Sequence, residues 1–224
     1  MRPSEQNEPV FSKRAAIFES DYWRDDEEEA ARFLKPGRLL IGGVGAGRTV
    51  GHLLNRGFDI QAVDISPEMV RRCKGRWPQI PVTVQDLQKT SFGEAQFDSI
   101  FLPFHTIAYV DDVDATLREM RRILRPDGVL VFSVPNHWYA RSIVSGDVFR
   151  GKRRSTPVKR GEPGTLATSF LSFADIGRVR KIFPAATVRG RISLSGRMEA
   201  PNWKDRVLRM APFLDKSLYF FCKA

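Results

Sequence analysis

The chain has 224 residues, 42% hydrophobic and 28% charged, a composition that fits one folded domain and excludes disordered, collagen-like and disulfide-scaffold classes. The two cysteines, Cys73 and Cys222, are too few for a zinc cluster, so we expect no metal. No apolar run has the length of a membrane span or the form of a signal peptide, so we expect a cytoplasmic protein. The net charge of +10 is uneven, since residues 1–149 hold 19 Lys and Arg against 21 Asp and Glu, whereas residues 150–224 hold 17 against 5.

The first 36 residues are predicted to form a helical cap on a core domain that covers 37–224. Their clearest helix signal is the acidic run at 25–29, followed by Ala30 and Ala31 and ended by a Pro-Gly pair at 36–37. Carboxylates in a first helical turn are favoured by the helix dipole.

From residue 38, short apolar runs alternate with helix-like segments. The predicted strands are 39–44, 60–65, 82–87, 99–104, 129–134, 187–194 and 217–223. The predicted helices are 47–56, 67–76, 112–124 and 173–183. Continuous apolar strands separated by helices are typical of a doubly wound α/β sheet with helices on both faces, which binds its ligand at the carboxyl ends of the strands.

Residues 140–170 interrupt this alternation. Glycines and prolines are frequent there, and six basic residues lie between Arg150 and Arg160. We interpret the segment as an inserted lid or substrate-binding element, the alternative being a flexible loop. The basic last third of the chain is either a face for an anionic ligand or a solvated surface.

The first apolar strand leads into GGVGAGR at 42–48. Gly43, Gly45 and Gly47 leave room for a ligand to approach the backbone of this strand-to-helix turn. A dinucleotide-binding turn has the pattern G-x-G-x-x-G, which would require glycine where Arg48 stands. The spacing therefore disfavours a pyrophosphate site and a nicotinamide-dependent oxidoreductase.

Two carboxylates follow the next two strands. Asp64 ends the run IQAVD and can accept hydrogen bonds from both hydroxyls of a ribose. A helix cap is its alternative role, but Ser66 already stands at the cap position. Asp86 can accept a hydrogen bond from the amine of an adenine, with Ile65 and Leu87 as apolar walls, or it is a solvated loop residue.

The motifs GVGAG, AVDIS, VQDL, FDSIFLPF and LREMRRILRPDGVLVFSVPN occur in this order. In this respect the sequence resembles the class I S-adenosylmethionine-dependent methyltransferases, strongly over residues 37–136. The closing SLYFFCK is similar to the last strand of that family. The resemblance implies S-adenosylmethionine as cofactor and a mostly parallel seven-stranded sheet with an antiparallel last strand.

The resemblance also implies roles for individual residues. Gly43, Gly45 and Gly47 would lie against the amino-acid portion and the ribose of the cofactor, and Leu102 would offer its carbonyl to the ammonium group. The family usually has an acidic residue two places before the first of these glycines, where this chain has Ile41. The missing carboxylate implies weaker binding, compensation by another group, or loss of catalysis.

On the adenosine side, the same resemblance implies that Asp64 holds the ribose hydroxyls. Ile65 would pack on the adenine, and Asp86 with Leu87 would face its amine and ring. A further implied element is an N-terminal lid, for which the aromatic pair at 22–23 is a candidate; the alternative is an anchor between helix and core.

The residues after the fourth and fifth strands face the place of a methyl acceptor. Four of them are weak candidates for a general base, namely His105, Tyr109, His137 and Tyr139. A base is needed only for an acceptor that loses a proton, and such side chains more commonly shape a pocket. No residue is therefore assigned a catalytic role.

The leading functional hypothesis is methyl transfer to an N, O or C atom of a small molecule. The basic insertion would favour an acceptor that bears a carboxylate or a phosphate. RNA is the second candidate acceptor, although the sequence shows no appended RNA-binding module. Because of Ile41, a cofactor-binding protein without catalytic activity is the third hypothesis.

Overall fold

The computed structural model describes most of the chain. The described residues are 3–13, 19, 21–136, 138, 153–157, 165–169, 171, 175–190, 215 and 217–224. His137, Tyr139 and most of the basic stretch at 150–160 lie outside them. Within the described ranges, no helix combines the length and the apolar character that crossing a bilayer would require.

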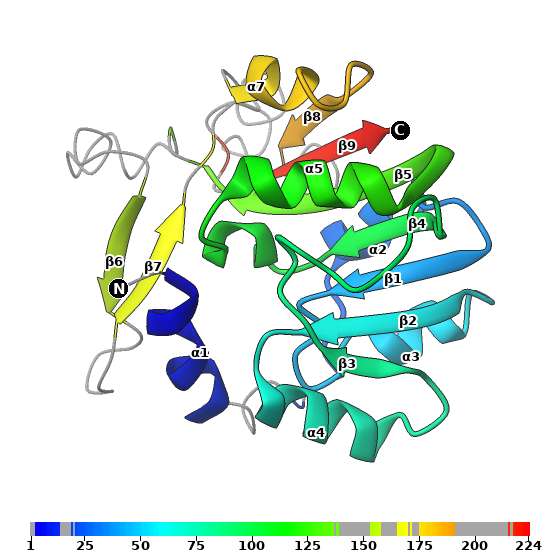
Figure 1. Cartoon of the computed structure of the whole chain (residues 1–224), viewed down its shortest axis with the longest axis vertical. Coiled ribbons are helices and arrows are strands. Elements are labelled where there is room, and N and C mark those ends of the chain that lie inside the picture. The colour runs from blue at the N-terminus through cyan, green and yellow to red at the C-terminus, as the bar shows by residue number, and fades with distance from the viewer. Residues whose placement is uncertain are drawn as a thin grey trace, which may run out of the picture.

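A seven-stranded sheet forms the centre of the molecule (Figure 1), in the order β3-β2-β1-β4-β5-β9-β8. Its strands are β1 (Arg38–Gly42), β2 (Asp59–Asp64), β3 (Val82–Val84), β4 (Phe97–Leu102), β5 (Leu124–Pro135), β8 (Thr187–Gly190) and β9 (Ser217–Lys223). β1 to β5 are mutually parallel, and β9 runs antiparallel to both β5 and β8. The predicted mostly parallel sheet with an antiparallel last strand is confirmed.

Helices cover both faces of this sheet (Figure 1), as predicted. One buried hydrophobic cluster joins it to α5 (Val113–Ile123) and α7 (Ile176–Arg180). The other joins it to α2 (Asp25–Ala31), α3 (Val50–Leu54) and α4 (Pro67–Arg76). Neighbouring residues of β1 enter different clusters, Leu40 the first and Ile41 the second. Strands buried on both faces explain the continuous apolar runs of the sequence.

β3 and α3 are shorter than predicted. β3 stops at Val84 because the Asp86 carboxylate accepts a hydrogen bond from the Gln88 backbone N–H at 2.9 Å, which turns the chain. α3 begins only at Val50, because Gly47 has a left-handed φ of +87° that a helix does not tolerate.

The insertion predicted at 140–170 contains a hairpin of its own. β6 (Arg153–Pro157) and β7 (Thr165–Ser169) pair antiparallel as a separate two-stranded sheet. β7 packs against α1 (Pro3–Lys13) and against the short helix η2 (Thr106–Tyr109). Figure 1 shows α1 and β7 beyond the edge toward which β1, β2 and β4 point. Two segments distant in sequence thus meet at the carboxyl ends of the strands.

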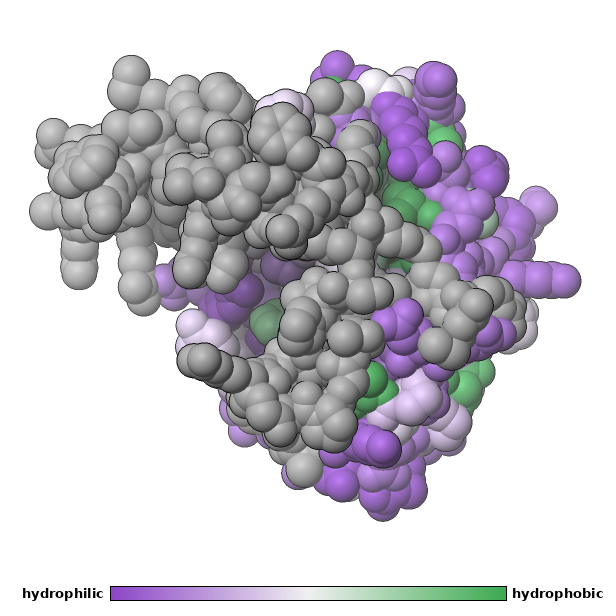
Figure 2. Space-filling view, turned by 90° about the vertical axis from the view of Figure 1, so that its left-hand side faces the viewer, coloured by the Kyte–Doolittle hydropathy of each residue, from purple (hydrophilic) through white to green (hydrophobic). Residues whose placement is uncertain are grey.

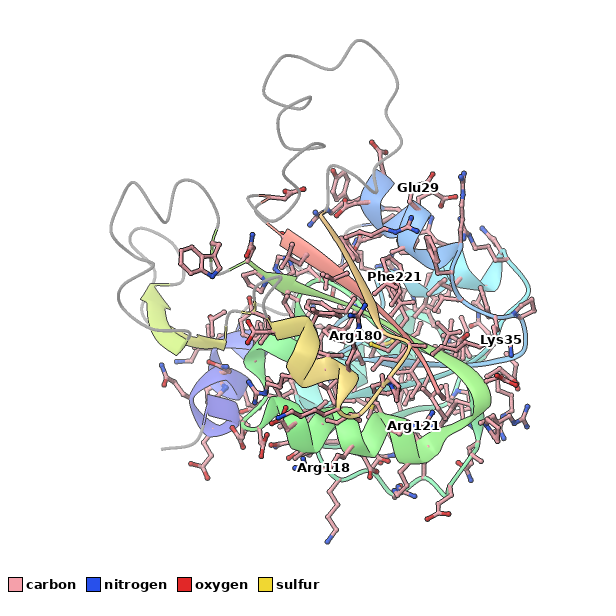
Figure 3. The ribbon with its side chains drawn as sticks, turned by 90° about the horizontal axis from the view of Figure 1, so that it is seen from above. Glu29, Lys35, Arg118, Arg121, Arg180 and Phe221 are labelled. Carbon is pink, nitrogen blue, oxygen red and sulfur yellow. The ribbon has the colours of Figure 1, made fainter. Side chains whose placement is uncertain are left out.

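The face covered by α5 and α7 carries basic side chains. The guanidinium carbon of Arg121 lies 5.7 Å from the centre of the Phe183 ring, and Arg180 Nε donates to the carbonyl of Ala186 at 2.9 Å. Figure 3 labels both arginines together with Arg118, on α5 and α7. These three exposed cations belong to a sheet face and not to the edge at which the strands end.

Candidate functional site

A cavity of about 330 Å³ lies over the carboxyl ends of β1, β2, β3 and β4. Its wall is built from the loops that follow these four strands, with α1 and η2 on the other side. Parallel α/β sheets bind their ligands at this edge, so the cavity lies where the strand order predicts a site. Figure 2 faces this side of the molecule, where hydrophilic residues surround small hydrophobic areas on the described surface.

The glycine loop after β1 forms one wall. Gly43 and Gly45 line the cavity with left-handed φ angles of +65° and +56°. A Cβ on Gly43 would lie 2.3 Å from Cγ2 of Thr106, so a side chain there cannot be accommodated without movement. The structure places Gly47 elsewhere: its Cβ would meet Trp77 Cδ1 at 2.6 Å, and its carbonyl accepts from Trp77 Nε1 at 2.8 Å. Gly47 thus allows α4 to approach the loop.

Asp64 lines the same cavity and is only 9% exposed. Its Oδ2 accepts a hydrogen bond from the Gly45 backbone N–H at 2.8 Å, and its Oδ1 accepts one from Ser66 at 3.0 Å. Burial raises the pKa of Asp64, against the opposing effect of the backbone N–H donors of Ser66 and Gly45. Each carboxylate oxygen has a second lone pair, so Asp64 can hold the loop and still accept from two hydroxyls.

The Asp64 side chain does not cap α4. That role belongs to Ser66, whose Oγ accepts from the Met69 backbone N–H at 3.3 Å. Ser66, as the sequence indicated, thus provides the helix cap that was the alternative role for Asp64.

The far end of the cavity is lined by residues after β2 and β3. Ile65, 37% exposed, presents an apolar side chain there, and Leu87 lies close by in the same wall. Asp86 also lines the cavity, but its carboxylate accepts from Gln88 Nε2 at 3.0 Å as well as from the Gln88 backbone. Asp86 therefore shapes the turn in addition to facing the cavity.

Leu102, at the end of β4, is fully buried and lies outside the described cavity wall. The two residues that follow it, Pro103 and Phe104, line the cavity in its place. Both Phe104 and His105 have left-handed φ angles, of +51° and +64°, which are uncommon in residues other than glycine. The chain thus turns sharply at this edge.

Helix α1 closes the cavity; sequence reasoning predicted a helical cap within residues 1–36 but placed no helix over 3–13. Phe11 of this helix lines the wall with its ring edge-on to Tyr109, at 5.2 Å between centroids. The Ser4 backbone N–H and hydroxyl each donate to the Asp111 carboxylate at 2.7 Å. No local pattern indicates this helix, because Pro9 lies inside it and an interior proline argues against helix formation.

Of the aromatic pair at 22–23, Trp23 has the anchoring role. Tyr22 is exposed, and neither residue contributes to the described wall of the cavity. Trp23 stacks on His52 at 4.8 Å, contacts the edge of Phe101 at 6.5 Å and donates from Nε1 to Glu28 at 2.8 Å. Of the two alternatives for this pair, the helix anchor is the one that the structure supports.

The candidate bases are placed differently from one another. Tyr109 lines the cavity beneath α1. His105 lies outside the described wall, with Nε2 at 3.0 Å from the hydroxyl of Ser217. His137 and Tyr139 lie outside the described residues. In the part of the chain that the structure describes, no three His, Cys, Asp or Glu side chains gather as metal ligands.

Ile41 is fully buried in the cluster that also contains Ala30 and Ala31 of α2. Arg48 and Thr49 are among the polar residues of the wall that sequence reasoning missed. Their only signal was their position directly after the glycine loop. A charge at this end of the cavity therefore comes from Arg48 and not from position 41.

The comparisons with known proteins agree with this geometry. Residues 40–132 match the methyltransferase domain family. The demethylmenaquinone methyltransferase of Beutenbergia cavernae is 33% identical over 105 residues, which cover 45% of this chain and 43% of that protein. The chain contains a class I S-adenosylmethionine-dependent methyltransferase domain. The chain spans about half the length, or less, of several curated relatives that it matches.

Two solved structures share the fold of this methyltransferase domain. The DhpI-SAM-HEP complex has a TM-score of 0.69 and 20% identity, covering 98% of this chain and 97% of that one. Phosphoethanolamine N-methyltransferase 2 of Haemonchus contortus, in complex with S-adenosyl-L-methionine, has a TM-score of 0.60 and 16% identity, covering 90% and 52%. The family and these complexes support S-adenosylmethionine as the cofactor of the domain.

The cavity fits this cofactor on its own residues. Asp64 offers a carboxylate beside bare backbone at Gly45, and Ile65 offers an apolar surface at the adjoining strand end. The buried Thr49 hydroxyl has no hydrogen-bond partner among the described residues, although Thr49 lines the cavity. A ligand with a nucleoside at one end and a polar group at the other would satisfy all of these groups.

Proposed function

We propose that the protein transfers a methyl group from S-adenosylmethionine to an N, O or C atom of a small molecule that bears a carboxylate or a phosphate. The observation that carries the cofactor assignment is the placement of Asp64 on the wall of a cavity that spans four strand ends. Bound S-adenosylmethionine supplies an electrophilic methyl group on its sulfonium sulfur.

The residues of this chain have two tasks in such a reaction. Asp64 and the loop at Gly43 and Gly45 hold and orient the cofactor, which converts an encounter between two molecules into an aligned reaction. Phe11 and Tyr109 place an aromatic wall above it and exclude water. Neither task needs a general base, so the site can act without one when the acceptor has a free electron pair.

The small-molecule class is supported by the way in which the cavity is closed. α1 is attached over it by Ser4 and Asp111, and the hairpin β6–β7 packs beside α1. An anionic acceptor is supported by the two arginines of this hairpin, Arg153 and Arg154 of β6. Electrostatic attraction would concentrate such an acceptor at this edge.

RNA is the second candidate acceptor. A groove that follows a phosphate backbone needs cations that continue outward from the site. Arg118, Arg121 and Arg180 lie instead on α5 and α7 and do not contribute to the described wall of the cavity. The described cations therefore favour the small acceptor.

Calorimetry with S-adenosylhomocysteine tests the cofactor assignment, with Asp64→Asn as the matched variant. We expect the wild type to bind and the variant to lose about 1.5–3 kcal/mol, because the amide replaces a charged acceptor. A radiolabelled methyl-transfer screen then compares pools of carboxylates, phosphates, neutral metabolites and RNA.

Each result of the screen has a different meaning. Transfer to carboxylates or phosphates supports the proposal, and transfer to RNA alone replaces it by the second candidate. Binding of S-adenosylhomocysteine without transfer to any pool would favour the non-catalytic cofactor-binding protein that Ile41 suggested. Absence of binding would refute the cofactor assignment.

A further inference from the structure

Phe104 presents an aromatic ring that the fold leaves half uncovered. It follows β4, lines the cavity and is 49% exposed, whereas the phenylalanines inside β4, β5 and β9 are buried. The other exposed large aromatic side chains of the described residues do not contribute to the described wall, namely Tyr22, Phe33 and Trp138. A large apolar side chain that stays accessible in a cavity indicates a ligand that covers it. Phe104 thus offers such a ligand a ring.

The Phe104 ring is held in its place by an unfavourable turn and by two contacts. Phe104 and the next residue, His105, have left-handed φ angles of +51° and +64°, which residues with a Cβ rarely adopt. The guanidinium carbon of Arg48 lies 5.4 Å from the centre of the Phe104 ring. The His105 ring is nearly parallel to it, at 6.1 Å between centroids and an angle of 16°. Strained backbone of this kind is concentrated at sites that clamp a ligand.

The surroundings of Phe104 add two more rings and little charge. Phe11 of α1 and Tyr109 of η2 lie edge-to-face at 5.2 Å between centroids. Pro103 and Val110 are apolar, and the polar side chains that α1 and η2 add to the described wall are uncharged. The charged residues of the described wall follow β1, β2 and β3, namely Arg48, Asp64 and Asp86. Rings in fixed positions favour a planar ligand, because aromatic rings attract one another in offset-stacked and edge-to-face arrangements.

Phe104 lies at the end of the cavity opposite the adenine wall. In the strand order β3-β2-β1-β4, Ile65 and Asp86 follow β2 and β3, whereas Phe104 follows β4. Asp64 accepts a hydrogen bond from Gly45 of the loop after β1, which lies between these two ends. A cofactor with its adenine at Ile65 and its ribose at Asp64 therefore leaves the surface at β4 for the acceptor.

We propose that the acceptor is an aromatic molecule, a planar ring that bears a carboxylate or a phosphate, and that Phe104 stacks on this ring. This inference rests on the proposed function and narrows its acceptor from any small anion to an aromatic one. The hairpin assigned to the anionic group packs through β7 on α1 and η2, the two elements that carry Phe11 and Tyr109. Neighbouring elements would thus bind the ring and its charged substituent.

The test measures binding to the protein saturated with S-adenosylhomocysteine by NMR titration of four probes. Benzoate is compared with cyclohexanecarboxylate, and phenyl phosphate with cyclohexyl phosphate, so each pair shares its charge and differs in the ring. We expect the aromatic member of at least one pair to bind about 2- to 10-fold more tightly, the range of an aromatic pair. A merely apolar pocket would not prefer it, because the saturated ring has at least as much apolar surface. No preference in either pair, or no binding of the aromatic probes, would overturn the inference.

Substitutions at Phe104 assign the preference to this ring. Phe104→Leu keeps an apolar side chain and should abolish the preference for the aromatic probes, whereas Phe104→Tyr keeps a ring and should retain it. Phe33→Leu is the matched control, because Phe33 is also partly exposed, also has an arginine over its ring, Arg189 at 5.0 Å, and lies outside the described wall.

The outcomes separate this inference from the proposed function. A preference that survives in Phe104→Leu would overturn the role of Phe104, and so would an equal loss of affinity for S-adenosylhomocysteine and for the aromatic probes, which would make Phe104 a cofactor contact. Methyl transfer to aliphatic anions alone would overturn the aromatic acceptor and leave the proposed function standing. Failure of the wild type to bind S-adenosylhomocysteine would instead refute the proposed function itself.

Discussion

The substitution Gly43→Ala tests how tightly the glycine loop is built against its surroundings. Two costs add at this position. A residue with a Cβ pays about 1–2 kcal/mol for a left-handed backbone, and the new methyl would lie 2.3 Å from Thr106 Cγ2 and 2.5 Å from its Oγ1. Thr106 cannot rotate away freely, because its hydroxyl donates to the carbonyl of Pro103 at 2.6 Å. Overpacking of this kind costs about 1–3 kcal/mol.

The matched control is Gly57→Ala. Gly57 also has a positive φ, +80°, but its Cβ would meet nothing within 4 Å. Only the backbone cost of about 1–2 kcal/mol then applies, so Gly43→Ala should lose about 1–3 kcal/mol more in urea unfolding. Calorimetry should show weaker S-adenosylhomocysteine binding for Gly43→Ala alone. Equal losses of stability at the two positions would refute the packing argument.

Three further substitutions give sharp expectations. Tyr219→Phe removes the hydrogen bond that the buried tyrosine hydroxyl donates to Asp26 Oδ2 at 2.7 Å. The free energy of unfolding, measured by urea denaturation, should fall by about 1–3 kcal/mol. A loss below about 0.5 kcal/mol would contradict this prediction. Trp23→Ala should lower the free energy of unfolding by about 1–3 kcal/mol and change the affinity for S-adenosylhomocysteine by less than about threefold. Unchanged stability with a larger loss of affinity would instead support a lid role for Trp23. The affinity for S-adenosylhomocysteine should fall as pH falls through the raised pKa of Asp64, because the protonated carboxyl no longer accepts hydrogen bonds from both ribose hydroxyls. This pH dependence should disappear in Asp64→Asn. A wild-type affinity that stays constant down to pH about 4, the ordinary carboxyl range, would contradict the prediction. The raised pKa also means that the contribution of Asp64 to stability is full below its unfolded value and is lost as pH rises through its folded value, which unfolding of the free protein can measure.

Much of the sheet could be predicted because its strands are local and regular. β9 matches the predicted segment 217–223, and α4 matches 67–76, since Ser66 and Pro67 mark its start clearly. Asp64 could be found because one strand fixes its position relative to the glycine loop. Local sequence patterns of this kind are sufficient to predict these features.

The closing helix and the cation of the site could not be predicted in the same way. α1 depends on contacts such as Ser4 with Asp111 and Ser12 with Ser66, which join residues far apart in sequence. Arg48 was visible only as the residue that breaks a dinucleotide pattern. Its role depends on Glu27, which α2 brings to it by packing on the sheet.

The acidic run at 25–29 shows why charge patterning alone is ambiguous. Helix-dipole reasoning treats its members alike, yet Asp26 and Glu27 are buried, each with its own arginine, at 24 and 48. Replacing a buried ion pair by apolar groups is often neutral for stability, so stability is a weak reason for such a pair to exist. What the Glu27 pair does provide is a guanidinium held at the cavity wall, and through it α2 is coupled to the cavity.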